Sequence, residues 1–153
     1  MALYLVQHGK SLPKEIDYEQ GLTDEGILDV ERIAGVAKSY GVMVYSIEHS
    51  GKKRARQTAE IFASALKPGR GVVERSGINP LDDVTAVADK LRSEENLMLV
   101  GHLPFMERLA SYLVTGSAQV RIFKFQNGGI VCLDKEPDTQ SWFIKWALMP
   151  KID

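Results

Sequence analysis

Two histidines follow short apolar segments that lie far apart in the chain. His8 comes one residue after the apolar stretch 2–6, and His102 comes one residue after the stretch 97–100. In open α/β sheets, ligands bind in the crevice beyond the carboxyl ends of the strands. If both stretches are parallel strands, the two imidazoles reach the same site. A neutral imidazole at such a site can act as a nucleophile and carry a phosphoryl group as covalent phosphohistidine.

Segment 49–60 contains cations that would favour an anionic ligand at this site. It runs from the expected end of a strand into a helix, and the N-terminus of a helix favours anions. Helical spacing places Arg54 at the edge of the inward stripe, whereas its cationic neighbours in the segment are expected on a solvated face. A guanidinium on the buried side needs an anionic partner, and its fork fits a phosphate. We therefore predict phosphoryl chemistry at His8, Arg54 and His102.

A metal centre is the alternative that histidines raise, because imidazole is the commonest metal ligand. The third histidine of the chain, His49, forms no His-x-x-x-His pair. The sequence also has no cluster of histidine and cysteine and no carboxylate at ligand spacing. We therefore predict that the site uses no metal and no cofactor. A Gly-x-x-x-x-Gly-Lys-Ser/Thr loop is missing too, which excludes a P-loop ATPase.

The composition is that of an ordinary soluble protein. The chain has 153 residues, of which 44% are hydrophobic and 25% charged, with a formal net charge of −1. This predicts one domain over residues 1–153 and no bulk affinity for nucleic acid or membrane. No apolar run approaches the roughly 20 residues that a membrane span needs. Cys132 is the only cysteine and lies in an apolar stretch, so we expect a buried core thiol and a reducing, cytoplasmic compartment.

Hydrophobic periodicity predicts that strands and helices alternate through most of the chain. We expect helices at 24–40, 52–66, 79–91 and 104–114, with Thr23 as the N-cap of the first. We expect strands at 2–7, 42–47, 72–73 and 97–100, and three more in the last third at 120–125, 130–133 and 142–148. This alternation is typical of an α/β fold.

Four motifs occur in a characteristic order: Gln7-His8-Gly9, Leu22-Thr23-Asp24-Glu25-Gly26, Ser50 through Arg54 to Ala59, and Gly101-His102-Leu103-Pro104. Together they resemble the histidine phosphatase superfamily, and within it the short SixA-type phosphohistidine phosphatases. The resemblance covers nearly the whole chain. It implies a three-layer α/β/α sandwich with a mostly parallel central sheet. It also implies that His8 is the nucleophile and that Arg54 and His102 bind the phosphoryl group.

The chain departs from this family in its phosphate-binding motifs. The first motif of the family normally reads Arg-His-Gly, so Gln7 removes one cation from the expected pocket. Its carboxamide still donates neutral hydrogen bonds, worth about 0.5–1.5 kcal/mol against about 1.5–3 kcal/mol for charged ones. Lys10 is a candidate to restore the charge, and Ser11 is a further candidate to bind phosphate. Gly51 stands where the family often has proline.

The general acid is open at this point. Superfamily members often use a carboxylate to protonate the leaving group, and the candidates here are Asp82 and Asp83. Either residue could instead cap the helix that follows. An imidazole leaving group, whose conjugate acid has a pKa near 6.5, needs little protonation, whereas an alkoxide usually needs a proton donor. This reasoning favours phosphohistidine as the substrate.

We therefore predict a metal-independent phosphatase that acts through phosphorylated His8 on phosphohistidine in another protein, such as a phosphotransfer domain or a phosphocarrier. A chain of this length leaves no room for a large cap over the site, which suits a protein substrate. Two alternatives stay open. One is a small-molecule phosphomonoesterase, and the other is a phosphate- or phosphopeptide-binding module whose catalysis is weakened by Gln7. The sequence does not indicate the oligomeric state.

Overall fold

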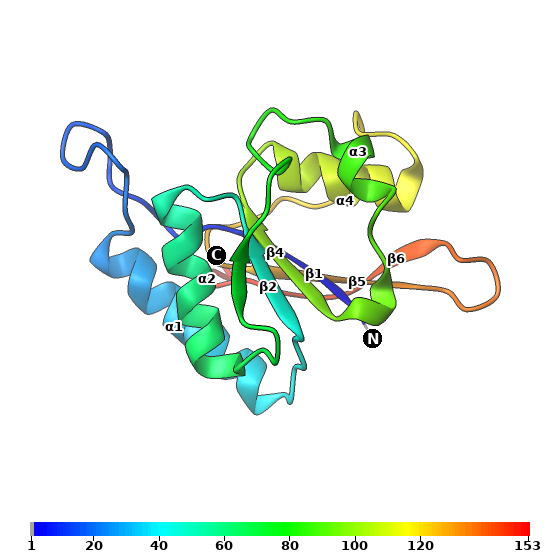
Figure 1. The fold of residues 1–153 in the computed structure, drawn as a ribbon, viewed down its shortest axis with the longest axis horizontal. Helices are drawn as coiled ribbons and strands as arrows, with labels where there is room; N and C mark the ends of the chain where they lie inside the picture. The colour runs from blue at the N-terminus through cyan, green and yellow to red at the C-terminus, as the bar shows by residue number, and fades with distance from the viewer. Residues whose placement is uncertain (1) are drawn as a thin grey trace.

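A six-stranded sheet runs through the centre of the computed structural model, which describes residues 2–153 (Figure 1). The strands are β1 (Leu3–Gln7), β2 (Ser46–His49), β3 (Val72–Glu74), β4 (Leu97–Gly101), β5 (Ile130–Lys135) and β6 (Trp142–Leu148). Their order is β3-β2-β4-β1-β5-β6. The first four of these neighbours pair in parallel, and β5 and β6 join antiparallel. The predicted α/β class with a mostly parallel sheet is confirmed.

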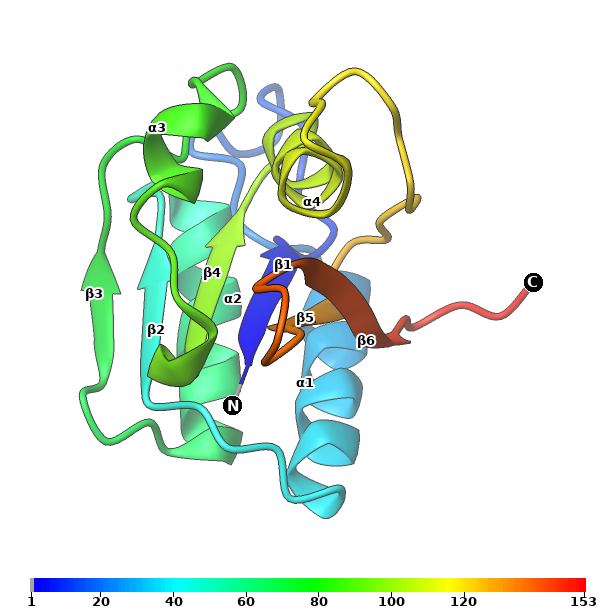
Figure 2. The same ribbon diagram turned by 90° about the vertical axis from the view of Figure 1, so that its right-hand side faces the viewer.

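Helices cover both faces of this sheet, which gives the three predicted layers (Figure 2). On one face lie α1 (Asp24–Ser39) and α2 (Lys53–Leu66), and on the other lie α3 (Val84–Ala88) and α4 (Phe105–Thr115). Side chains of a strand alternate between the faces. Tyr4 and Val6 of β1 therefore pack with α1 and α2, while Leu3 and Leu5 pack with α3 and α4. Burial on both faces explains why the parallel strands are almost continuously apolar.

The start of α1 is set by local side-chain chemistry. Thr23 is the N-cap, as predicted, and its Oγ1 accepts a hydrogen bond from the Gly26 N–H at 2.9 Å. The loop that follows β1 returns to this turn, where the Thr23 N–H donates to the Lys10 carbonyl at 2.9 Å. A Cβ atom on Gly26 would collide with that same carbonyl oxygen. Only glycine therefore lets the loop after His8 pack against α1.

The strand predicted at 120–125 is wrong. This segment forms no strand and no helix. The Phe125 N–H instead donates to Oε2 of Glu107 in α4 at 3.0 Å, and the Phe123 and Phe125 rings pack edge to face. Both rings lie in the hydrophobic cluster that contains α4. The apolar side chains of this segment therefore serve packing on a helix rather than pairing in the sheet.

Two other predicted boundaries shift. The helix expected over 79–91 is confined to α3, and a 3₁₀ turn, η1 (Ser93–Glu95), precedes β4. The strand expected at 42–47 is β2, which begins at Ser46 and includes His49. Residue 42 is still bound to the end of α1, because its N–H donates to the Ala37 carbonyl at 3.0 Å. Because residue 42 is hydrogen-bonded to the end of α1, β2 begins later in the sequence than predicted.

Candidate active site

His8 and His102 converge at the carboxyl edge of the sheet, as their positions after the two strands predict. The strands β1 and β4 are parallel neighbours in which Gln7 is opposite Gly101. The His8 N–H donates to the Gly101 carbonyl at 2.9 Å, which continues this pairing past the strand end. The centroids of the two imidazole rings are 5.1 Å apart. The site therefore depends on the register of two strands that are far apart in sequence.

The imidazole of His8 has a defined tautomer. Its Nδ1 is 2.7 Å from the carbonyl oxygen of Gly9, which can only accept a hydrogen bond, so Nδ1 carries the proton. The lone pair is then on Nε2. Burial lowers the pKa of His8 to about 4, the Gly9 hydrogen bond opposes this shift, and the positive charge of Arg54 adds to it. At neutral pH the ring is therefore uncharged and nucleophilic at Nε2.

His102 is also neutral and almost fully buried. Its Nε2 lies 2.7 Å from Oγ of Ser50, while its Nδ1 is buried without a hydrogen-bond partner in the described part of the chain. An orphaned buried N–H costs more than an orphaned acceptor, so we place the proton on Nε2. Burial lowers the pKa of His102 to about 3, with further contributions from His8, Arg54 and Lys52. Nε2–H of His102 therefore donates to Ser50 Oγ, and it donates to an anion only where the anion replaces that acceptor.

Arg54 lies in the first turn of α2. Its side chain is half-buried, and across residues 2–153 its guanidinium makes no ion pair and no hydrogen bond. Its charge contributes to the lowered pKa of His8 and of His102. A half-buried guanidinium without a carboxylate is suited to an external anion, and its geometry fits phosphate. The structure thus brings His8 and His102 together, and the charge of Arg54 acts on both.

Two polar side chains that the sequence did not indicate hold residues 8 and 9 in place. Oγ1 of Thr58 in α2 accepts a hydrogen bond from the Gly9 N–H at 2.9 Å. Nδ2 of Asn127 donates to the His8 carbonyl at 2.9 Å. The sequence contains one indication for Thr58. Its hydroxyl lies within the apolar stripe of a helix, and a buried hydroxyl needs a hydrogen-bond partner. Asn127 gave no signal beyond its place in a turn.

The other residues expected to bind phosphate are placed differently. Gln7 is at the end of β1, and its Oε1 is buried without a hydrogen-bond partner in residues 2–153. Nζ of Lys10 is 2.8 Å from Oε2 of Glu25, so it does not provide a free cation. Ser11 forms an isolated antiparallel bridge with Leu22. Gln7 therefore adds no charge at the end of β1, and the charge of Lys10 is paired with that of Glu25.

Asp82 and Asp83 satisfy backbone groups of their own loop. Oδ2 of Asp82 accepts from the Asn79 N–H at 2.8 Å. Asp83 is the N-cap of α3, where its Oδ1 accepts from the Thr85 N–H at 2.9 Å. The hydrogen bond from the Thr85 hydroxyl, at 2.8 Å, and the one from the Thr85 N–H lower the pKa of Asp83, so it is a carboxylate at neutral pH. The capping role thus accounts for Asp83 without a role as a proton donor.

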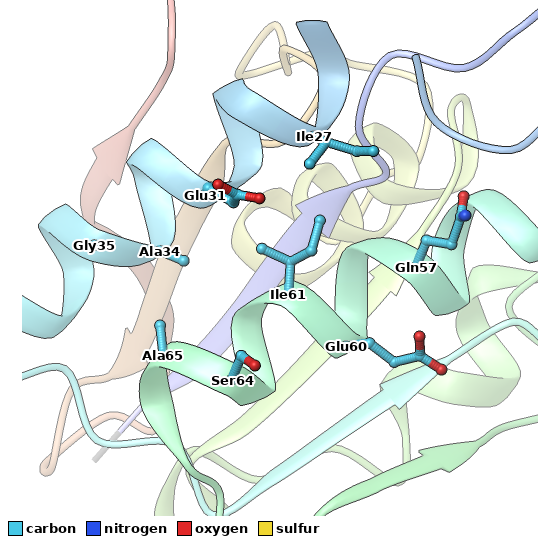
Figure 3. Close-up of a pocket in the computed structure, with 9 residues that line it drawn as sticks. All are labelled: Ile27, Glu31, Ala34, Gly35, Gln57, Glu60, Ile61, Ser64 and Ala65. Carbon is cyan, nitrogen blue, oxygen red and sulfur yellow. The ribbon is translucent and has the colours of Figure 1, made fainter. Parts of the chain in front are cut away.

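A groove between α1 and α2 is a second concave surface (Figure 3). Its floor includes the apolar side chains of Ala34 and Ile61, and the carboxylates of Glu31 and Glu60 lie at its sides. Its lining residues include no histidine, cysteine or cation. Because acidic side chains repel phosphate, the histidine pair and not this groove is the candidate for phosphoryl chemistry.

Two further properties follow from the coordinates. In the described part of the chain, no three side chains of histidine, cysteine, aspartate or glutamate gather in a way that could hold a metal ion. Between residues 2 and 153, no helix has the length and apolar character needed to cross a bilayer.

No protein-family model matches this sequence, and no curated protein matches it. Solved structures do resemble it. The protein histidine phosphatase SixA complexed with tungstate superposes with a TM-score of 0.84 at 22% identity, over 98% of this chain and 97% of that one. A candidate SixA phosphohistidine phosphatase from Agrobacterium tumefaciens gives 0.77 at 25% identity, over 97% of each chain. This chain has the histidine phosphatase fold.

Proteins with the histidine phosphatase fold differ in what they act on. A mycobacterial glucosyl-3-phosphoglycerate phosphatase, for example, superposes with a TM-score of 0.72 at 13% identity, over 97% of this chain and 99% of that one. Its name describes a small-molecule phosphatase, whereas the SixA proteins are named for phosphohistidine. The histidine phosphatase fold by itself therefore does not select the substrate.

Proposed function

We propose that this protein is a phosphatase that transfers a phosphoryl group to His8 and then to water. The observation that carries the proposal is the hydrogen bond from His8 Nδ1 to the Gly9 carbonyl at 2.7 Å. It leaves the lone pair on Nε2 of a neutral ring, next to the neutral His102 and within the influence of the charge of Arg54. A fixed nucleophilic nitrogen next to anion-binding donors is the arrangement that covalent phosphoryl transfer requires.

In the first step, Nε2 of His8 attacks phosphorus. The new P–N bond forms as the bond from phosphorus to the leaving group breaks, and the leaving atom takes a proton from solvent. The phosphoryl oxygens accept hydrogen bonds from the guanidinium of Arg54 and from Nε2–H of His102, which exchanges Ser50 Oγ for a phosphoryl oxygen. These donors stabilise charge that is spread over the equatorial oxygens in the transition state.

In the second step, water attacks the phosphorus of phosphorylated His8. A P–O bond forms, the P–N bond breaks, and inorganic phosphate leaves. One proton of the water passes to solvent, and Nε2 of His8 regains its lone pair. The Gly9 carbonyl keeps the proton of His8 on Nδ1 throughout, so the ring returns to its starting tautomer.

We propose phosphohistidine on another protein as the substrate. Imidazole leaves with little protonation, which suits a site where Asp83 already caps a helix. The loop that follows His8 projects from the body of the protein (Figure 1) and exposes Ile16 and Tyr18, at 72% and 85% of their surfaces. Exposed apolar side chains in the loop that follows His8 favour contact with a protein partner over contact with a small metabolite.

One observation favours a second candidate function. Because Gln7 is neutral, the site holds its anion with less charge than an arginine would supply at that position. A phosphate- or phosphopeptide-binding module with little turnover is the function that this weakening would produce.

The test is phosphate release, without added metal, from a panel of phosphohistidine-carrying phosphotransfer domains and phosphocarriers, with p-nitrophenyl phosphate as the small-molecule member. We expect release from a phosphohistidine protein, acid-labile phosphate on His8 during turnover, and loss of both in His8→Ala. Full turnover by His8→Ala contradicts the nucleophile. Faster release from p-nitrophenyl phosphate than from every protein favours a small-molecule phosphomonoesterase. Phosphoprotein binding without release supports the binding module.

A further inference from the structure

The first turns of α2 and the residue before it carry four cations, and they differ in whether a carboxylate neutralises them. Nζ of Lys53 lies 3.2 Å from Oδ2 of Asp17, and Nε of Arg56 lies 3.8 Å from Oε1 of Glu60. Within residues 2–153, Lys52 and Arg54 have no such partner. Arg54 is already part of the site. Of these four cations, Lys52 is therefore the one with neither a carboxylate partner among the described residues nor a place in the proposed site.

The turn before α2 places Lys52 next to His102. Gly51 has a φ of +93°, a left-handed conformation that suits glycine and that proline cannot adopt. After this turn the Lys52 N–H donates to Ser50 Oγ at 3.4 Å, and the same oxygen is 2.7 Å from Nε2 of His102. Lys52 is thus separated from His102 by two hydrogen bonds. Its charge is also among the causes that lower the pKa of His102.

The carboxylate of Glu74 leaves no space for a side chain at residue 51. A Cβ atom on Gly51 would lie 2.8 Å from Cδ of Glu74, closer than real contacts of this kind. Gly51 therefore fixes both the direction of the chain and the position from which Lys52 starts. The proline that the family often has at this position could not form the same turn.

Without Lys52, the positive charge of the proposed site is smaller than the negative charge of a phosphoryl group. A phosphoryl group at pH 7 carries about 1.5 to 2 negative charges. Gln7 is neutral, Lys10 is bound to Glu25, and both histidines are neutral at this pH, so among the described residues proposed for the site Arg54 alone carries an unneutralised positive charge. An exposed lysine has a compact charge on a flexible four-carbon stem, which lets the ammonium reach an anion beside its own backbone.

We propose that Lys52 is a phosphate-binding residue of this site and supplies the second positive charge that Gln7 does not. For catalysis the inference rests on the proposed function, but for anion binding it does not. Because Lys52 is exposed, its contribution is screened by salt, whereas that of the half-buried Arg54 is screened less.

The experiment compares Lys52→Gln with Arg56→Gln, which removes the same charge from the same helix but breaks an exposed pair outside the site. The readouts are the Kd for tungstate, an oxyanion of phosphate shape, and kcat/KM on the phosphohistidine protein. We expect Lys52→Gln to weaken tungstate binding about tenfold, the effect of one charge-assisted hydrogen bond, and Arg56→Gln to change it less than about twofold. The difference between Lys52→Gln and the wild type should shrink as ionic strength rises from about 0.01 to about 1 M.

A double variant tests whether the two positions share one role. Gln7→Arg should restore tungstate affinity in Lys52→Gln by a larger factor than it improves the wild type, because either cation then suffices. Equal losses in Lys52→Gln and Arg56→Gln, or strictly additive effects of residues 7 and 52, overturn the inference. If tungstate binding depends on Lys52 but no substrate is turned over, the proposed function fails and the inference stands. A wild type that does not bind tungstate overturns both.

Discussion

The hydroxyl of Thr58 connects the backbone at Gly9, next to His8, with the backbone of Arg54 in α2. It accepts a hydrogen bond from the Gly9 N–H at 2.9 Å and donates to the Arg54 carbonyl at 2.8 Å, and the side chain is fully buried. The carbonyl of Gly9 in turn fixes the tautomer of His8. One side chain therefore holds both the backbone next to His8 and the backbone of Arg54.

Thr58→Val should lower both stability and activity. Valine keeps the shape of threonine but leaves the buried Gly9 N–H without its acceptor, which costs about 1–3 kcal/mol. We expect this loss in the free energy of unfolding measured with urea, together with a lower kcat because the Gly9 carbonyl is no longer held against His8. Thr58→Ser keeps the hydroxyl and is the control. A Thr58→Val protein that matches the serine variant in both measurements would contradict the role of this hydrogen bond.

Gln7→Arg should raise phosphatase activity. It replaces neutral hydrogen bonds to the phosphoryl group by charged ones, a gain of about 1–2 kcal/mol, and each 1.36 kcal/mol is about tenfold in rate. The measurement is kcat/KM on the phosphohistidine protein. Gln7→Glu, which brings a negative charge to the same position, should lower kcat/KM. An unchanged or reduced value for Gln7→Arg shows that residue 7 does not face the phosphoryl group.

Two glycines of α1 should respond to the same substitution with opposite sign. Gly26→Ala puts a methyl group into the Lys10 carbonyl, and overpacking of this kind costs about 1–3 kcal/mol. A Cβ atom on Gly35 meets nothing within 4 Å, so Gly35→Ala should stabilise the helix by about 0.5–1 kcal/mol. Urea unfolding of both variants checks this. Loss of stability in both would show that Gly35 is also constrained.

Acid should destabilise the fold through the buried histidines. The folded pKa values of His8 and His102 are about 4 and about 3, below the ordinary value of 6.5. Between these values and 6.5 the unfolded chain binds more protons than the folded one, so the free energy of unfolding falls as the pH is lowered through this window. Carboxylates contribute to the same experiment, so the comparison needs a variant.

His102→Asn isolates the histidine contribution. Asparagine does not titrate, so the free energy of unfolding should depend less steeply on pH below about 6.5 than in the wild type. Urea unfolding at a series of pH values gives both slopes. Identical slopes would mean that His102 is not held neutral by burial in the folded protein.

Local patterns determined much of the fold and the centre of the site. The apolar stretches predict β1 and β4 because both faces of a central strand are buried, and their ends predict that His8 and His102 meet. The Thr23 cap follows in the same way from the local sequence at the start of a single helix. Each of these features depends on a few neighbouring residues and on general rules of sheet topology.

Only the tertiary structure decided how polar groups are partnered across the chain. Lys10 is neutralised by Glu25, the Gly9 N–H is satisfied by Thr58, and the His8 carbonyl by Asn127, in pairs separated by 15, 49 and 119 residues. The apolar segment 120–125 looked like a strand because hydrophobicity does not distinguish pairing in a sheet from packing on α4. A hydrogen bond or a packing contact depends on which groups the fold brings together, and that is a property of the whole chain rather than of any segment.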